Sequence, residues 1–136
     1  MSSPQEIRYL VSAGLLPGEL GLLLAAAAGS TYTEAMLTRL IEGSTAYVTA
    51  RAGDRLVGFG RLLSDGAVTA YINNMAVSPD HQDMGIGGRL LDMLVEAAGE
   101  VKSIYLYTDT ADAFYRRHDF HPSEKRLYVR RCNAHP

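Results

Sequence analysis

Residues 75–98 of the chain are MAVSPDHQDMGIGGRLLDMLVEAA, and this stretch decides the interpretation of the fold. A strand-like run ends near Val77, a turn with three glycines follows, and leucines then recur at the spacing of one helix face. A helix N-terminus leaves its first N–H groups unpaired, and glycines remove the Cβ atoms that would keep an anion away from them. The stretch therefore predicts a strand, a glycine turn and a helix that together can hold a pyrophosphate.

The glycine pattern does not match the two best-known phosphate loops. The dinucleotide-binding fingerprint requires a third spaced glycine, and that position is Leu90. The P-loop requires Lys and then Ser or Thr after its last glycine, whereas Arg89 follows Gly88. On the glycines alone, a turn that merely starts a helix is an equally good interpretation.

The rest of the chain predicts a mixed α+β sheet with helices on its faces, in one domain over residues 1–136. The turn dipeptides Gly53-Asp54 and Asp65-Gly66 join three strand-like runs into an antiparallel meander. A later strand returns parallel to the third run by a right-handed crossover. The predicted elements, in order, are strand Ile7–Val11, helix Leu16–Ala28 ending at Gly29, a helix capped by Thr31 and Glu34, strands Ala46–Arg51, Arg55–Leu63 and Val68–Val77, the helix up to Ala98, strand Ile104–Tyr107, helix Ala111–Arg117 and an extended stretch Leu127–Arg131.

Composition narrows the function classes. The net charge of -2 gives no reason to expect nucleic-acid binding. The single cysteine, Cys132, cannot form an internal disulfide, which favours a reducing, cytoplasmic location. The apolar run 20–30 is preceded by acidic Glu6 and Glu19 and is too short to span a bilayer, so we expect no secretory signal and no membrane partner. The spacing of His and Cys suggests no metal site.

Two motifs resemble the GNAT superfamily of acyl-CoA N-acyltransferases. Residues 75–79, MAVSP, followed by QDMGIG at 82–87 and a helix, resemble its motif A. Residues 111–120, ADAFYRRHDF, resemble its motif B helix, with Asp119 in place of a glycine whose left-handed conformation Asp tolerates. The resemblance covers nearly the whole chain and implies a small bacterial-type N-acetyltransferase with acetyl-CoA as cosubstrate. The implied fold is an antiparallel meander followed by βαβα, with the central strands splayed.

The resemblance also implies a cofactor site between the splayed strands. The pantetheine arm would pair with backbone groups of Met75 and Val77, and the pyrophosphate would rest on amides of the glycine turn. Arg89, Arg116 and Arg117 are candidate contacts for the remaining phosphate, although exposed helix arginines need no ligand. The implied cofactor-binding residues are Met75, Ala76, Val77, Gln82, Asp83, Met84, Gly85, Ile86, Gly87 and Gly88.

By the same resemblance, Tyr115 is the general acid that protonates the departing CoA thiolate. Simple packing of Phe114 and Tyr115 against the sheet is the alternative. Asn74 stands where family members often carry an acid, and an amide cannot accept the proton of the amine. A water chain, Asp109 or a partly neutral substrate are the options for its removal, although Asp109 is also placed to cap a helix.

The motifs do not identify the acceptor. In the family its pocket is framed by segments that correspond here to Gly29–Thr33 and Phe120–Tyr128. Four tyrosines could line that pocket or pack in the core, namely Tyr32, Tyr71, Tyr105 and Tyr107. We expect a small-molecule amine rather than a protein lysine, and the family relationship makes a homodimer an expectation. A catalytically silent CoA-binding sensor or interaction module is the alternative function, favoured by the missing acid; a dinucleotide enzyme ranks third.

Overall fold

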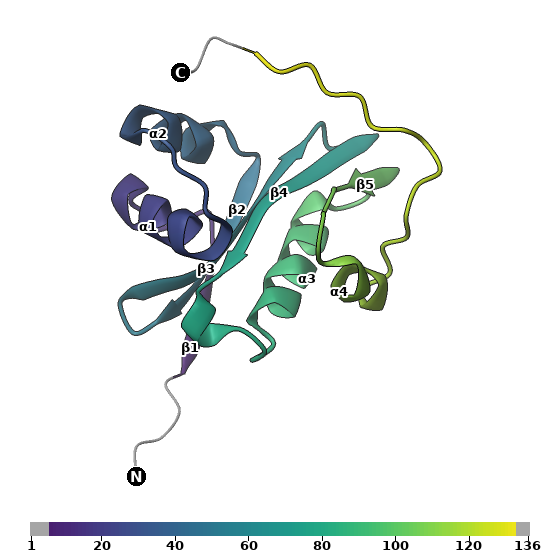
Figure 1. The fold of residues 1–136 in the computed structure, drawn as a ribbon. Coiled ribbons are helices and arrows are strands. Elements are labelled where there is room, and N and C mark those ends of the chain that lie inside the picture. The colour runs from purple at the N-terminus through teal and green to yellow at the C-terminus, as the bar shows by residue number, and fades with distance from the viewer. Residues whose placement is uncertain (1–5, 133–136) are drawn as a thin grey trace.

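The computed structural model describes residues 6–132, which form a five-stranded sheet with helices on both faces. Figure 1 shows α1 and α2 on one face of the sheet, and α3 and α4 on the other. The elements are β1 (Ile7–Val11), α1 (Pro17–Ala28), α2 (Glu34–Gly43), β2 (Ala46–Ala52), β3 (Arg55–Ser64), β4 (Thr69–Val77), the short 3-10 turn η1 (Pro79–His81), α3 (Ile86–Ala98), β5 (Ser103–Tyr105) and α4 (Asp112–Arg117).

The sheet confirms the predicted mixed topology. Strands β1 to β4 form an antiparallel meander in sequence order, and β5 joins β4 in parallel after the α3 crossover. Pairing between β4 and β5 covers three residue pairs, from Thr69 with Ser103 to Tyr71 with Tyr105. The rest of β4, as far as Val77, therefore has no β5 backbone beside it, and this half of the strand borders the site.

A bulge interrupts β4 in that open half. Phe59 pairs with Ala76 and Arg61 pairs with Asn73, so β4 advances three residues where β3 advances two. Asn74 takes a left-handed φ of 57°, which asparagine adopts more readily than most residues. The extra residue of the bulge redirects the strand at the edge of the site.

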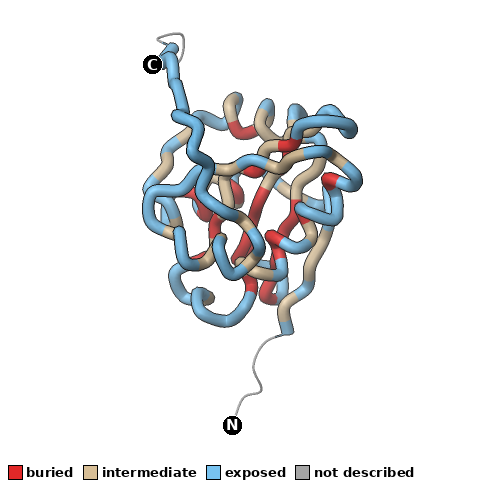
Figure 2. The backbone as a smooth tube through the Cα atoms, turned by 90° about the vertical axis from the view of Figure 1, so that its right-hand side faces the viewer, coloured by how far each residue is buried: buried red, intermediate tan, exposed pale blue. Residues whose placement is uncertain are grey.

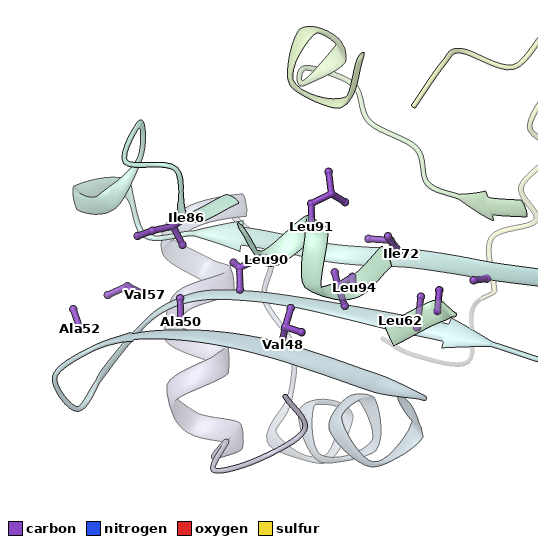
Figure 3. Close-up of a cluster of buried hydrophobic side chains, with 12 residues drawn as sticks. Val48, Ala50, Ala52, Val57, Leu62, Ile72, Ile86, Leu90, Leu91 and Leu94 are labelled. Carbon is purple, nitrogen blue, oxygen red and sulfur yellow. The ribbon is translucent and has the colours of Figure 1, made fainter. Parts of the chain in front are cut away.

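The core between α3 and the sheet fixes where the glycine turn lies. Ile86, Leu90 and Leu94 of α3 are buried against Val48 and other small apolar side chains of the sheet (Figure 3). The helix lies so close to β3 that a Cβ atom at Gly58 would be 2.8 Å from Leu90 Cδ1. The glycine in β3 thus permits the close approach that sets the position of the α3 N-terminus.

Helices α1 and α2 cover the opposite face through a cluster that includes Leu20, Leu24 and Phe59. α1 ends at Gly29 with φ 67°, as predicted. The predicted cap of α2 is corrected by two residues: the Thr33 hydroxyl, rather than that of Thr31, accepts the N–H of Met36 at 3.1 Å. No helix in the described part of the chain is both long and apolar enough to cross a membrane.

The C-terminal segment differs from its prediction. Residues 121–132 are exposed throughout and contain no strand (Figure 2). The predicted stretch Leu127–Arg131 stays unpaired, and Leu127 and Tyr128 expose 66% and 86% of their surface. An apolar alternation indicates a strand only where a sheet is available to bury one face, and here the segment lies outside the five strands.

Candidate functional site

A cleft of 1130 Å³ lies between the open half of β4, the N-terminus of α3 and helix α4. Its volume is slightly above the range of about 300–1000 Å³ that is typical of small-molecule and cofactor sites. Of the ten predicted cofactor-binding residues, only Met84 does not line it. The nine that do are Met75, Ala76, Val77, Gln82, Asp83, Gly85, Ile86, Gly87 and Gly88.

The strand side of the cleft offers backbone groups. The Ser78 N–H donates to the Val57 carbonyl of β3 at 2.7 Å. Neighbouring strand residues direct their backbone groups to opposite sides, so those of Val77 face the open side. The Gln82 side chain donates to the Val77 carbonyl at 3.3 Å, which braces the end of the strand. The Val77 N–H is therefore the group left for a partner, and the side chain of Gln82 has a structural role.

The helix side of the cleft offers unpaired N–H groups. Gly85 directly precedes α3 as its N-cap, with φ 82°, and the Arg89 N–H donates to the Gly85 carbonyl at 3.2 Å. The N–H groups of residues 86–88 precede this first bond and have no acceptor within the helix. A Cβ at Gly87 would lie 3.5 Å from Phe114 Cζ, in the space between α3 and α4. Residue 87 thus borders a cradle that a larger side chain would fill, and this arrangement fits a phosphate-bearing ligand.

Tyr115 faces this cradle from α4. Its ring packs edge-on against Phe114 and Phe120, with centroid distances of 5.0 and 6.0 Å, and the residue also lines the cleft. Burial raises the pKa of the Tyr115 phenol above its ordinary value of 10.0. The hydroxyl therefore stays protonated at neutral pH, which is the state that a proton donor requires.

The basic residues near the cleft have different surroundings. Arg89 and Arg117 line it, whereas Arg116 pairs with Asp112 at 2.7 Å within α4. His118 also lines the cleft, and its ring lies 3.0 Å from the position of a Cβ at Gly88. The sequence motifs did not predict His118 as a site residue. His118 directly follows α4, and its position four residues after Phe114, whose ring it contacts, was the available signal.

A polar cluster occupies the bulge of β4. The Arg61 Nε donates to Asn74 Oδ1 at 2.9 Å, and Asn74 Nδ2 donates to the Tyr32 hydroxyl at 3.4 Å. The Tyr71 and Tyr107 rings lie near each other with centroids 5.9 Å apart, and burial raises the pKa of Tyr71. Of the four predicted tyrosines, Tyr105 and Tyr107 are exposed, by 52% and 61%.

The expected capping role of Asp109 is not observed. The Thr108 hydroxyl accepts the N–H groups of Thr110 and Ala111, at 3.3 and 3.0 Å, just before α4 begins. Asp109 is exposed and is absent from the lining of the cleft. Asp119 does adopt the predicted left-handed conformation, with φ 67°. Within residues 6–132, no three His, Cys, Asp or Glu side chains gather as a metal site would require.

Comparisons with known proteins agree with this architecture. A family model described as an acetyltransferase (GNAT) domain matches residues 42–122, more than half of the chain. GCN5-related N-acetyltransferase 2, chloroplastic, of Arabidopsis thaliana is 31% identical in a 96-residue alignment that covers 64% of this chain and 37% of that relative. The chain thus spans little more than a third of the length of this curated relative.

Solved structures share the fold. A Staphylococcus aureus protein superposes with a TM-score of 0.83 at 22% identity, covering 93% of this chain and 100% of that one. A GNAT-family acetyltransferase of Streptococcus pneumoniae superposes with a TM-score of 0.79 at 23% identity, covering 93% and 99%. With the family model matched across β2 to β4, the glycine turn and α4, the chain belongs to the GNAT acetyltransferase family.

Proposed function

We propose that the protein transfers an acetyl group from acetyl-CoA to a primary amine. One observation carries the proposal: a single cleft brings the open edge of β4, the unpaired N–H groups of α3 and the Tyr115 phenol together. The pyrophosphate rests on the amides of residues 86–88, and the pantetheine arm pairs with the backbone of Met75 and the Val77 N–H.

The transfer is a direct attack on the thioester. The amine nitrogen attacks the thioester carbonyl carbon, the new N–C bond forms, and the C–S bond breaks. The sulfur leaves with the electron pair and takes a proton from Tyr115, while the nitrogen releases its extra proton to water. The phenolate then regains a proton from solvent. Because Asn74 cannot accept a proton, the amine enters in its neutral form.

The polar cluster at the bulge supports a small-molecule acceptor. Tyr32, Tyr71 and Asn74 are half-buried, and Asn74 directly precedes the cleft residue Met75. Half-buried phenol and amide groups suit a small amine that carries polar substituents.

The test measures thiol release from acetyl-CoA across a panel of primary amines, with acetyl-CoA binding measured separately by calorimetry. We expect amine-dependent thiol release that is lost in Tyr115→Phe. Binding of acetyl-CoA without thiol release for any amine would identify the catalytically silent module instead. Absence of acetyl-CoA binding would contradict both functions.

A further inference from the structure

The polar cluster contains a cation without a counter-ion. Arg61 belongs to β3 and pairs in register with Asn73 of β4. Phe59, two residues earlier in β3, packs in the cluster under α1 and α2, so the Arg61 side chain projects from the sheet face that these helices cover. It is half-buried, and its Nε is bound to the Asn74 side chain. Within residues 6–132 the Arg61 guanidinium forms no ion pair, and its terminal nitrogens make no hydrogen bond. Most of its donors are therefore available to a ligand.

A second arginine on this face shows the usual arrangement. Arg51 of β2 is 6% exposed and meets the Glu19 carboxylate of α1 through both terminal nitrogens. The Glu19 carboxylate raises the pKa of Arg51, whereas burial lowers the pKa of Arg61. A partly desolvated charge without a partner costs free energy, so the cost at Arg61 points to an anion that arrives with a ligand.

The position of Arg61 near the cleft indicates that this anion belongs to the acceptor. Asn74 joins Arg61 to the bulge, and the next residue, Met75, lines the cleft. The Tyr32 and Tyr71 phenols are close enough to affect the pKa of Arg61, although burial, which lowers this pKa, has the larger effect. The guanidinium thus lies beside the open half of β4, on the face opposite α3. In the proposed function the thioester lies at this open half of β4, so an acceptor held by Arg61 would reach it from the face that α1 and α2 cover.

We propose that Arg61 binds a carboxylate of the acceptor, so that the substrates are small molecules carrying both a primary amine and a carboxylate. This inference rests on the proposed function. A planar guanidinium matches a carboxylate with two parallel hydrogen bonds, which fixes the orientation of the substrate as well as its affinity. The carboxylate would hold the acceptor while its neutral amine attacks the thioester carbonyl.

The test uses pairs of amines that differ by one carboxylate. Suitable pairs are 4-aminobutyrate with propylamine, 5-aminopentanoate with butylamine, and phenylalanine with phenethylamine. We expect the carboxylated member of at least one pair to have a kcat/KM about 10- to 100-fold higher, as a charge-assisted hydrogen bond implies. In Arg61→Gln this ratio should fall to near one, and Arg61→Lys should restore part of it.

Controls separate the possible failures. Arg39→Gln removes one exposed positive charge from α2 and should keep the ratio of the parent. If Arg61 only braced the bulge, Arg61→Gln would slow both members of each pair equally. Calorimetric titration of the same amines into the protein, with and without CoA, measures the preference for the carboxylated member in the absence of acetyl transfer. Tighter binding of the carboxylated members in the parent alone supports the inference even if no acetyl group is transferred. Equal binding of both members to the parent would overturn it.

Discussion

The packing role of Tyr115 resides in its ring, whereas its proposed catalytic role resides in its hydroxyl group. Tyr115→Phe keeps the ring contacts with Phe114 and Phe120 and removes the proton donor. Loss of a general acid costs about 10²- to 10⁴-fold in rate. We expect kcat to fall in that range while the calorimetric Kd for acetyl-CoA stays close to that of the parent. An unchanged kcat would remove Tyr115 from the mechanism.

The pH dependence of kcat/KM is also determined by single groups, the amine of the substrate and the phenol of Tyr115. The free fraction of an alkylamine with a pKa of about 10 rises about tenfold per pH unit below that value. Because burial raises the pKa of Tyr115 above 10.0, the acid stays protonated over the same range. We therefore expect kcat/KM for a simple amine to rise steadily between about pH 6 and pH 9. A flat or falling profile over this interval would indicate a titrating group elsewhere in the mechanism.

Residues of the site differ in how far the sequence predicts them. The glycines and Tyr115 occur in contiguous motifs, so their positions follow from local structure. Arg61 and Asn74 are 13 positions apart and meet only through the shifted register of β3 and β4. No local pattern records that register, and the cluster could not be predicted from the sequence.

The ion pair between α1 and β2 ties two elements together. Glu19 also accepts the Leu16 N–H at the start of α1, at 2.9 Å. Glu19→Gln leaves Arg51 buried without its counter-charge, and breaking such a pair costs about 3–5 kcal/mol. We expect urea unfolding to show a loss of this order. Glu42→Gln, at an exposed position of α2, should change the free energy of unfolding by less than about 0.5 kcal/mol.

The ion pair between Glu19 and Arg51 also makes the free energy of unfolding depend on pH. Its hydrogen bond with Arg51 lowers the pKa of Glu19 below the ordinary 4.5 in the folded protein. The contribution of the pair is thus complete above pH 4.5 and is lost as the pH falls through the lower folded pKa. Acid titration should destabilise the parent more steeply than Glu19→Gln. If the free energy of unfolding fell equally steeply with pH in both proteins, the Glu19–Arg51 pair would contribute little to stability.

Elements were predicted well where local patterns determine them. Leucine spacing located α1 and α3, and two turn dipeptides separated β2, β3 and β4. β5 ends at Tyr105 rather than Tyr107, because β4 diverges from it after three residue pairs. The bulge in β4 and the absence of a strand at residues 127–131 depend on pairing with a neighbouring strand. The sequence of a single segment does not determine that pairing.

At the scale of the whole molecule, binding of a ligand to the folded state should increase the stability of the protein. A ligand that binds only the folded state at 100 times its Kd stabilises it by about 2.7 kcal/mol. Acetyl-CoA should therefore raise the Tm, and NAD should not, since the glycine turn lacks the dinucleotide fingerprint. An equal shift with NAD would indicate a general nucleotide site.

The overall topology followed from the sequence because the meander, the glycine turn and the α4 motif are each local and occur in a fixed order. The proposed acceptor site did not follow from the sequence, since the polar cluster combines residues of β3, of β4 and of the segment between α1 and α2. In the proposed function the cradle at the N-terminus of α3 depends on the missing side chain of Gly87.

The most direct test is a calorimetric titration of acetyl-CoA into the parent, Gly87→Glu and Gly43→Glu. Gly43→Glu adds the same side chain where the space around the glycine is open, far along the chain from the cleft. We predict binding at millimolar affinity or tighter for the parent and Gly43→Glu, and none for Gly87→Glu. Equal binding of acetyl-CoA by all three proteins would contradict the account.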